Sequence, residues 1–593
     1  MNFDYFVIPF LIGSLYFFIV IIWKFANIIR SLNTTDKKKL LKGLIGLPLI
    51  RSIIEIFSES LLHRKIFKVN IMMGLMHSSL AFGWFLLIAF GTIESKIHSG
   101  KPFNMPYDPI FLKYFTHNVN TIPYFGLFSF IMDFLLAVVL SGVLFAFIKR
   151  FRSMLFGMRR TTNLNFNDKF ALYSLWAIFP LRYLAESFSS ALYENGGFLT
   201  GTSGMIINNI FDIQTIQMLT NPIWWGYSIA LCIFFIAIPY SRYMHIPAEL
   251  LLIFFRQAGI DMKTKERGKR WLELYSCSRC GICIDNCQLS SSLKINNIQP
   301  AYFLTSERRK EENKDATLNC LLCGRCETYC PVGINVNNHR IVSRERYNKR
   351  IKNNYEYLEN KGNSLEQYDV LYFAGCMTHL TPSIKKAMIK IFNHNKINYR
   401  FIDENGSICC GRPLKTNGLT ESAKAIREKN TDLINSFNGK ILVTSCPICY
   451  KEFSEEYRLN IPVLHHTQFI DNLIKNTTIL KKGNDKYIYH DPCDLGRGSG
   501  VYEQPRNILN NIGQIIKIKN QKEKAFCCGG SLANHILTDN QKVELANQAL
   551  SEYKKYSPDY LVTSCPLCKK SFSRLNSIET KDIAEIVAEN IQN

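Results

Sequence analysis

Nineteen cysteines supply most of the chemistry that this 593-residue sequence offers, and eight of them form two tight runs. The runs CSRCGICIDNC and CLLCGRCETYC share the spacing C-x2-C-x2-C-x3-C. Four thiolates at this spacing ligate a [4Fe–4S] cluster, and in paired runs the fourth cysteine ligates the other cluster. We therefore predict one cluster on Cys277, Cys280, Cys283 and Cys330, and a second on Cys320, Cys323, Cys326 and Cys287.

Structural zinc is the competing interpretation of these runs. A zinc site normally closes a tetrahedron with two separated C-x2-C pairs, which four thiolates within one short run fit poorly. Pro331 follows the second run, whereas Gln288 takes that place after the first. The 32 residues from 288 to 319 exceed the spacer of a compact bacterial ferredoxin, so we expect an α-helical ferredoxin fold with a dicluster.

Ten further cysteines form an internal repeat over residues 368–593. Each copy has a single cysteine, an adjacent pair in a CCG sequence, and a C-x2-C pair in TSCPxC. The first copy holds Cys376, Cys409, Cys410, Cys446 and Cys449, and the second holds Cys493, Cys527, Cys528, Cys565 and Cys568. The spacings agree to within one residue, with 32 and 33 residues before the pair and 35 and 36 after it. Only Cys232, in an apolar stretch, lies outside these motifs.

Short apolar runs such as YDVLYFAG, KILVTSC and DYLVTSC alternate with amphipathic stretches in this repeat. Strands that alternate with helices predict a duplicated α/β module, and each cysteine group follows the end of a strand, where such folds place their sites. Five thiolates exceed the capacity of one tetrahedral zinc, which favours a larger cluster.

The repeat resembles the CCG domain of heterodisulfide reductase catalytic subunits, which also occurs in iron–sulphur subunits of glycolate, lactate and anaerobic glycerol-3-phosphate dehydrogenases and in relatives of succinate:quinone reductase. YHDPCDLGRGSGVYEQPRNIL carries the match, except that Asp494 replaces a common histidine. The resemblance implies that one or two non-cubane [4Fe–4S] clusters, on the two sets of five cysteines, form the catalytic centre. His465, His466 and His490 are candidate proton donors, although structural roles are more common for such histidines.

Residues 1 to about 250 contain five apolar stretches near the 20 residues or so that a membrane-crossing helix needs, at 5–27, 70–92, 123–148, 170–191 and 222–244. The fourth carries Arg182 and Glu186, so a re-entrant helix is an alternative there. We predict a helical bundle of about five spans. Asp4 replaces the basic start of a signal peptide, so the first stretch is expected to be an anchor.

The formal charge of +23 is concentrated in two loops beside these spans, which favours a membrane over nucleic acid as partner. The basic residues of the loops are Lys37, Lys38, Lys39, Lys42, Arg51, Arg64, Lys65 and Lys68, and then Lys149, Arg150, Arg152, Arg159 and Arg160. The opposite segments hold only Lys96, Lys101 and Lys113. The positive-inside rule then predicts an inner-membrane, multi-pass protein with its N-terminus outside and its cysteine motifs in the cytoplasm.

His77 and His245 lie at the cytoplasmic end of the second and fifth stretches, and histidines at matched depth are candidate haem ligands. The layout resembles the b-haem subunit of respiratory nitrate reductases and the membrane subunit of methanogen heterodisulfide reductase. We predict one haem b, with His63 as an alternative ligand. His98 and His117 fall in the external loop and offer no second pair.

We thus predict four domains: a b-haem-type membrane domain at 1–250, a dicluster domain at 251–350, and CCG domains at 368–475 and 485–593. The expected function is a membrane-bound oxidoreductase that exchanges electrons between menaquinone or a similar quinone and a cytosolic partner, with disulfide/thiol chemistry at the CCG clusters. The alternatives are an electron-transferring-flavoprotein:menaquinone oxidoreductase and an electron-relay subunit of a 2-hydroxy acid dehydrogenase. No G-x-G-x-x-G or Walker loop occurs at a strand–helix junction, so a flavin must come from a partner.

Overall fold

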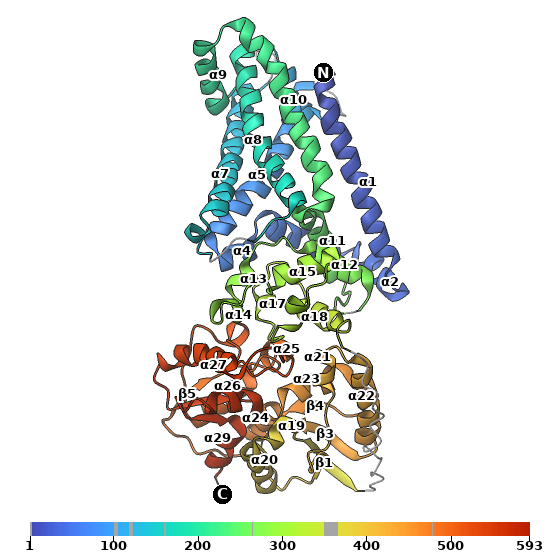
Figure 1. Cartoon of the computed structure of the whole chain (residues 1–593), viewed down its shortest axis with the longest axis vertical. Coiled ribbons are helices and arrows are strands. Elements are labelled where there is room, and N and C mark those ends of the chain that lie inside the picture. Colours follow the sequence, from blue (N-terminus) through green and yellow to red (C-terminus); the bar gives the residue numbers. More distant parts are fainter. Residues whose placement is uncertain are drawn as a thin grey trace. The chain divides into compact units, whose positions relative to one another are not determined.

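The protein is represented by a computed structural model that describes residues 3–99, 105–117, 123–158, 162–263, 265–348, 366–476 and 478–592. Lys101, Arg159 and Arg160 of the predicted loops lie outside these residues. The chain forms two compact units, residues 1–282 and 283–593 (Figure 1).

The first unit is entirely helical over its described residues. Its long helices are α1 (Ile8–Arg30), α5 (Ile71–Ser99), α7 (Phe125–Phe151), α8 (Phe166–Tyr193) and α10 (Ile213–Ala237). Shorter helices connect them: α2 (Thr34–Gly43), α3 (Leu47–Glu55), α4 (Arg64–Val69), α6 (Asp108–Phe115), α9 (Phe198–Ile210), α11 (His245–Gln257) and α12 (Arg267–Ser276). A π-helix, Ile56–Leu61, continues α3.

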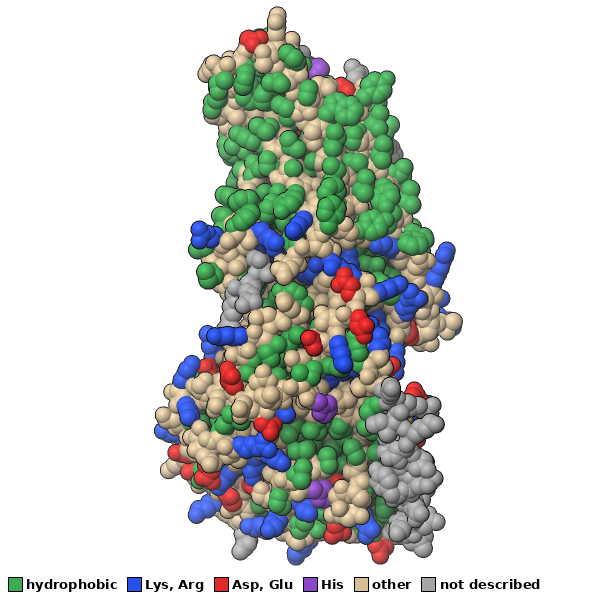
Figure 2. Space-filling model, viewed as in Figure 1, with side chains coloured by type: hydrophobic (Ala, Val, Ile, Leu, Met, Phe, Trp, Pro, Cys, Tyr) green, Lys and Arg blue, Asp and Glu red, His purple; other side chains and the backbone are tan. Residues whose placement is uncertain are grey.

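Four segments are long and apolar enough to cross a membrane: Tyr5–Arg30, Ile71–His98, Phe125–Phe151 and Ile213–Tyr240. They carry exposed apolar side chains such as Leu15, Ile22 and Phe134, and Figure 2 shows hydrophobic side chains covering this unit, with Lys and Arg gathered beneath them. An apolar surface of this extent is expected only where lipid or another partner covers it. Four of the five predicted spans are thus present as apolar helices.

The remaining predicted span, 170–191, forms within the 28-residue helix α8, but this helix is too polar to join the other four. Its charges are internal, because Nε of Arg182 lies 2.8 Å from Oε1 of Glu186 and both side chains are buried. A paired charge that faces protein avoids the cost of an isolated charge in lipid. Whether α8 crosses the bilayer or re-enters it stays a prediction.

The second unit begins with short helices around the cysteine runs: α13 (Ile282–Asp285), α14 (Gln288–Ser291), α15 (Pro300–Arg309), α16 (Lys314–Leu318), α17 (Arg325–Thr328) and α18 (Val336–Arg344). This arrangement agrees with the predicted α-helical ferredoxin fold.

Two four-stranded parallel sheets follow, in the orders β2-β1-β3-β4 and β6-β5-β7-β8. Their strands are β1 (Gln367–Phe373), β2 (Tyr399–Phe401), β3 (Asn438–Thr444), β4 (Val463–His465), β5 (Lys486–Tyr489), β6 (Gln514–Ile515), β7 (Tyr560–Thr563) and β8 (Thr580–Asp582). The same order in each sheet confirms the predicted duplication of an α/β module.

Most helices of the first copy have a counterpart in the second, and α21 is the exception among the described residues. The first copy has α19 (Cys376–His379), α20 (Pro382–His394), α21 (Arg412–Thr416), α22 (Thr420–Asn435), α23 (Pro447–Glu456) and α24 (His466–Asn476). The second has α25 (Gly496–Ser499), α26 (Glu503–Ile512), α27 (Asp539–Lys554), α28 (Pro566–Ser573) and α29 (Ile583–Asn590). One apolar core joins both copies, with Ile384 and Met388 of α20 in the same cluster as Ile586 of α29. Burial of a shared core makes the two copies a single folded body.

Candidate functional site

The ends of the parallel strands position the cysteines of the repeat. Cys376 begins α19 just after β1, while Cys446 and Cys565 are the N-cap residues of α23 and α28, just after β3 and β7. Cys493 follows β5 in the same way. This is the edge at which parallel α/β sheets place their functional groups.

The thiols of the first copy are in direct contact. Cys409 and Cys449 hydrogen-bond to the sulphur of Cys410, which holds the pKa of Cys410 well below its usual value. Cys449 also hydrogen-bonds with Cys446. Gly375 leaves room beside them: a Cβ added there would lie 2.9 Å from Sγ of Cys449. A thiolate-rich cradle that a methyl group would fill suits an iron–sulphur cluster.

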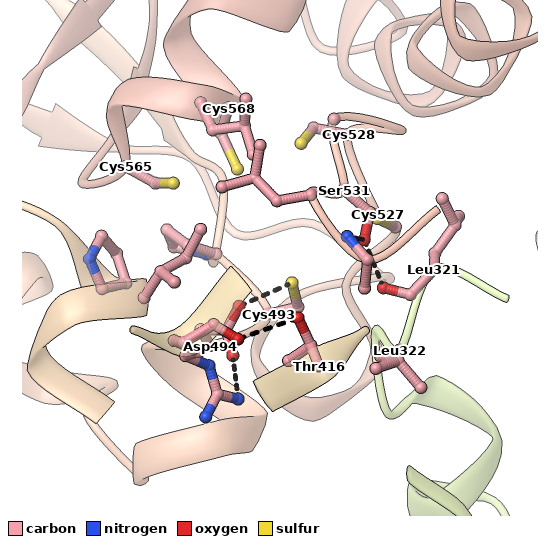
Figure 3. A pocket seen from close by; sticks show the side chains of 18 of the residues that line it. Leu321, Leu322, Thr416, Cys493, Asp494, Cys527, Cys528, Ser531, Cys565 and Cys568 are labelled. Atoms are coloured by element: carbon pink, nitrogen blue, oxygen red, sulfur yellow. Dashed lines mark hydrogen bonds and ion pairs between the residues drawn. The ribbon is translucent and has the colours of Figure 1, made fainter. Parts of the chain in front are cut away.

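The second copy repeats this arrangement around a pocket lined by all five of its cysteines (Figure 3). The Cys527 thiol hydrogen-bonds with Cys493 and Cys528, and Cys528 with Cys568. Cys528 has a strongly lowered pKa because Cys527 and Cys568 donate to it. Both copies therefore bring their cysteines together as the repeat predicted.

Asp494, the residue that departs from the family pattern, forms an ion pair in this pocket. Its Oδ1 lies 2.9 Å from Nη2 of Arg412, which comes from the first copy. Nη1 of Arg412 lies 3.4 Å from Oε2 of Glu452. Arg412 is thus buried between two carboxylates, and it ties the first copy to the site of the second.

Three cysteines of the ferredoxin runs, Cys287, Cys320 and Cys323, lie close together within the second unit. Burial raises the pKa of Cys287 to about 12, and the nearby Cys320 and Cys323 add to this rise. Cys287, the last cysteine of the first run, therefore lies near the second run, and its sharing of a cluster with that run stays a prediction. Cys277 and Cys280 belong to the first compact unit, and Cys283 and Cys330 to the second.

The second run lies against the second CCG copy, which no local pattern indicated. The thiol of Cys527 hydrogen-bonds to the sulphur of Cys323 and lowers the pKa of Cys323 to about 5. Gln288 hydrogen-bonds with both the amide and the carbonyl of Cys527. Arg497 donates to the carbonyl oxygens of Cys323 at 2.7 Å and Ala525 at 2.8 Å. These contacts hold the second run and the CCG pair Cys527-Cys528 in a fixed relation.

Arg344, at the end of α18, also connects the ferredoxin region with the CCG copies. Its buried guanidinium donates to five carbonyl oxygens, with distances of 2.7 to 3.1 Å. They belong to Thr317, Leu318 and Cys320 of the ferredoxin region, Thr416 of the first copy and Ala533 of the second. Burial lowers the pKa of Arg344 to about 10, so the group stays charged near neutral pH.

The loop of the first run is fixed within the helical unit. Arg279, between Cys277 and Cys280, lies 2.5 Å from Oδ2 of Asp168 at the start of α8, and both side chains are buried. Oδ1 of Asp168 accepts from the amide of Arg242 at 2.7 Å. The carbonyl of Arg242 in turn lies 2.7 Å from Nδ1 of His245. A continuous set of polar contacts therefore joins the first cysteine run to the turn that carries His245.

The candidate haem histidines lie in the same unit. Nε2 of His77 is buried and has no hydrogen-bond partner among the described residues. The rings of His63 and His77 are stacked with centroids 5.3 Å apart, and His245 is near enough to His77 to act on it electrostatically. A buried, unpartnered imidazole nitrogen suits a metal ligand. His63 therefore remains an alternative partner of His77.

The other predicted candidates fit structural roles. Burial lowers the pKa of His490 to about 4, and its Nδ1 lies 2.7 Å from the Tyr553 hydroxyl. Burial also lowers the pKa of His465. Neutral, enclosed imidazoles fit a packing role better than proton donation. Within the part of the chain that the structure describes, no three His, Cys, Asp or Glu side chains converge as they would around a single metal ion, so all cluster ligands stay predictions.

Comparison with known proteins identifies the two cysteine regions. A family model described as a cysteine-rich CCG domain matches residues 370–454 and 487–573, and a 4Fe-4S dicluster domain model matches 273–334. These segments lie inside the predicted domains, whose boundaries stay predictions. The matches confirm both kinds of domain and the duplication.

Three curated relatives are similar over large parts of the chain. An EtfAB:quinone oxidoreductase of Syntrophomonas wolfei is 22% identical, over 79% of this chain and 84% of the relative. A polypeptide of the dihydromethanophenazine:CoB–CoM heterodisulfide reductase of Methanosarcina barkeri is 25% identical, over 56% of this chain and 98% of the relative. A probable iron-sulfur-binding oxidoreductase of Bacillus subtilis, FadF, is 21% identical, over 87% of this chain and 89% of the relative.

Proposed function

We propose that this iron–sulphur oxidoreductase, with its 4Fe-4S dicluster domain and two cysteine-rich CCG domains, exchanges electrons between a membrane quinone and a cytosolic redox partner. The observation that carries the proposal is the contact between Cys323 and Cys527. It makes the ferredoxin region and the catalytic repeat neighbours within one compact unit. The apolar helices of the other unit supply the membrane side.

The residues that hold the redox groups follow from the cysteine sets. The eight cysteines of the two runs hold two cubane [4Fe–4S] clusters, and the two sets of five hold one or two non-cubane clusters. His77 and His245 hold one haem b, with His63 as the alternative. These groups supply one-electron steps when bound. The chain's own residues orient them: Gln288 and Arg497 fix the second run against Cys527, and Asp168 fixes the first run against the His245 turn.

The chemistry of the cytosolic side has two candidates. The leading one is reversible cleavage of a disulfide at the CCG cysteines, as the name of the heterodisulfide reductase relative suggests. The second is electron exchange with a flavoprotein. One observation favours the second: the EtfAB:quinone oxidoreductase relative matches 79% of this chain, whereas the heterodisulfide reductase relative matches 56%. A relay for a 2-hydroxy acid dehydrogenase is a third candidate that no observation here favours.

The basic loops support an orientation with the cysteine domains in the cytoplasm and the N-terminus outside. Cysteine accessibility in whole cells and inside-out vesicles tests this. A thiol reagent that cannot cross membranes should label Lys38→Cys more strongly than the wild-type protein, and only in the vesicles. Labelling in whole cells would reverse the proposed orientation.

The function is tested on detergent-purified full-length protein by optical and EPR spectroscopy. A quinol should donate electrons to the iron–sulphur clusters, which changes their EPR signals. The optical band of haem b should be absent from His77→Ala. Reoxidation by a disulfide supports the leading chemistry, whereas reoxidation only by an oxidised flavoprotein supports the second. Iron–sulphur signals that no quinol and no flavoprotein alters would overturn the proposal. If the wild-type protein shows the iron–sulphur signals but no haem band, only the assignment of the haem histidines is wrong.

A further inference from the structure

Because the CCG module is duplicated, the two copies meet at two equivalent contacts. The residues at these two contacts differ. After the CCG sequence, Arg412 of the first copy corresponds to Gly530 of the second. After the single cysteine, Met377 of the first copy corresponds to Asp494 of the second. Arg412 meets Asp494 at one contact, and Gly530 and Met377 line one pocket at the other. Comparison of the two contacts shows what the sequence has changed.

The contact of Arg412 with Asp494 is occupied by charged side chains that pair with one another. The guanidinium lies 2.9 Å from Asp494 and 3.4 Å from Glu452, and the Glu452 side chain is 1% exposed. Glu455 adds a further carboxylate nearby. The carboxylates outnumber the guanidinium, so this contact offers no positive charge to an anionic ligand.

The other contact lacks this group of paired charges. Gly530 replaces the arginine, Met377 the aspartate, Ser571 the equivalent of Glu452, and Arg574 the equivalent of Glu455. Lys542 stands where the first copy has Ala423, since the carbonyl oxygens of these two residues face Gly529 and Gly411 in the same way. Every one of these replacements removes negative charge, adds positive charge or opens space.

The result is a basic pocket, defined here by Met377, Gly530, Lys542, Lys570 and Arg574. Its cavity volume is about 200 Å³. Asp539 is the one carboxylate among its lining residues, and it lies 3.6 Å from Lys542 and is largely exposed. Neither Lys570 nor Arg574 has an ion pair among the residues that the structure describes. Leu532, Val543 and Leu567 give the pocket an apolar floor.

We propose that the basic pocket binds the anionic group, a carboxylate or a phosphate, of a small-molecule substrate. Its volume is enough for one end group of a small molecule, and an apolar lining with a few charged groups is the usual composition of small-molecule sites. Lysine and arginine at the rim provide charge-assisted hydrogen bonds to such an anion. Met377 directly follows Cys376 of the first copy, and Gly530, Leu532 and Leu567 also line the pocket of the second-copy cysteines. The inference rests on the proposed function only in taking these cysteines as the redox centre.

The test uses inorganic pyrophosphate as a probe and isothermal titration calorimetry on the full-length protein in detergent. Wild-type protein should bind the probe, and more weakly at higher ionic strength. Lys570→Gln with Arg574→Gln should weaken binding about tenfold or more, because charged hydrogen bonds are lost. The matched control is Lys451→Gln, since Lys451 occupies the equivalent place in the contact of Arg412 with Asp494 and should leave binding within about twofold of wild type.

Ser571→Glu is a second variant, which returns the carboxylate that Glu452 supplies at the other contact without removing a cation. It should also weaken binding of the probe. Iron content and EPR spectra should match the wild type in all variants, which separates loss of the site from loss of the fold. Binding that is unaffected by both variants, or equally weakened by Lys451→Gln, would overturn the inference.

Reduction by quinol is measured on the same samples. Protein that binds pyrophosphate through Lys570 and Arg574 but is not reduced overturns the proposed function alone. Protein that is reduced but does not bind the probe overturns the basic pocket alone.

Discussion

Gln288 and Cys527 exchange two hydrogen bonds although they are 239 residues apart in the chain. Nε2 of Gln288 donates to the carbonyl oxygen of Cys527 at 3.2 Å, and the amide of Cys527 donates to Oε1 of Gln288 at 2.6 Å. Proline commonly occupies this position in ferredoxin runs and has no side chain for such bonds. The glutamine therefore joins the end of the first run to the second CCG copy.

Gln288→Leu should leave the amide of Cys527 buried and unpaired, at a cost of about 1–3 kcal/mol in unfolding free energy. It should also shift the EPR signal or the midpoint potential of the cluster held by the second run. Thermal unfolding and redox titration monitored by EPR measure the two effects. Gln299→Leu is the control, because Gln299 is equally buried but bonds to Ile295 in its own region. A similar redox change in both variants would contradict the specific role of Gln288.

Asp168→Asn tests how the first run is attached to the helical unit. The change removes the negative charge that lies against the buried Arg279 guanidinium, and loss of one member of a buried ion pair costs about 3–5 kcal/mol. We expect the cluster of the first run to be lost or altered while that of the second run remains. Iron content and EPR of the purified protein report this. Lys169→Gln changes an exposed neighbour and should alter neither.

The Arg412–Asp494 pair should couple the two CCG copies energetically. In a double-mutant cycle with Arg412→Gln and Asp494→Asn, we expect a coupling energy of about 1–3 kcal/mol from chemical denaturation. Arg412→Gln alone should cost more than Asp494→Asn alone, because Arg412 also contacts Glu452, which is almost completely buried. Additive effects of the two substitutions would show that the ion pair contributes nothing.

Glu249 predicts a pH dependence of stability in the helical unit. Burial raises the pKa of Glu249 from 4.5 to about 7, although Arg256 and Lys65 partly oppose the rise. A raised folded pKa means that its stabilising effect is complete below pH 4.5 and is lost as the pH rises through about 7. The difference corresponds to about 3 kcal/mol.

Glu249→Gln should remove most of this dependence. The variant should unfold at a higher temperature than the wild type at pH 8 and at a similar temperature at pH 4.5. Differential scanning calorimetry in detergent at both values gives the comparison. Equal stability of the two proteins at pH 8 would mean that the carboxylate is hydrated in solution.

The cysteine runs and the repeat could be predicted from the sequence because ligands of a cluster recur at short, fixed spacings. The strand ends before Cys446 and Cys565 could also be predicted, because a local pattern, an apolar run with β-branched residues, precedes each of them. Contacts such as Gln288 with Cys527 and Asp168 with Arg279 could not be predicted, because they join residues distant in the chain. Helix α8 shows another limit: a composition rule counts Arg182 and Glu186 as charges, whereas the fold pairs them.

The five carbonyl bonds of Arg344 determine where a chain of this kind can be divided into separate polypeptides. A break between residues 344 and 366 would put the guanidinium in one piece and its acceptors Thr416 and Ala533 in the other. If these two pieces separated, the carbonyls of Thr416 and Ala533 would lose their donor. A break ahead of residue 273, before the dicluster domain, keeps all five bonds in one piece and leaves the first cysteine run intact. Fusion and fission of genes for such oxidoreductases should therefore occur before the ferredoxin region and spare the joint behind it.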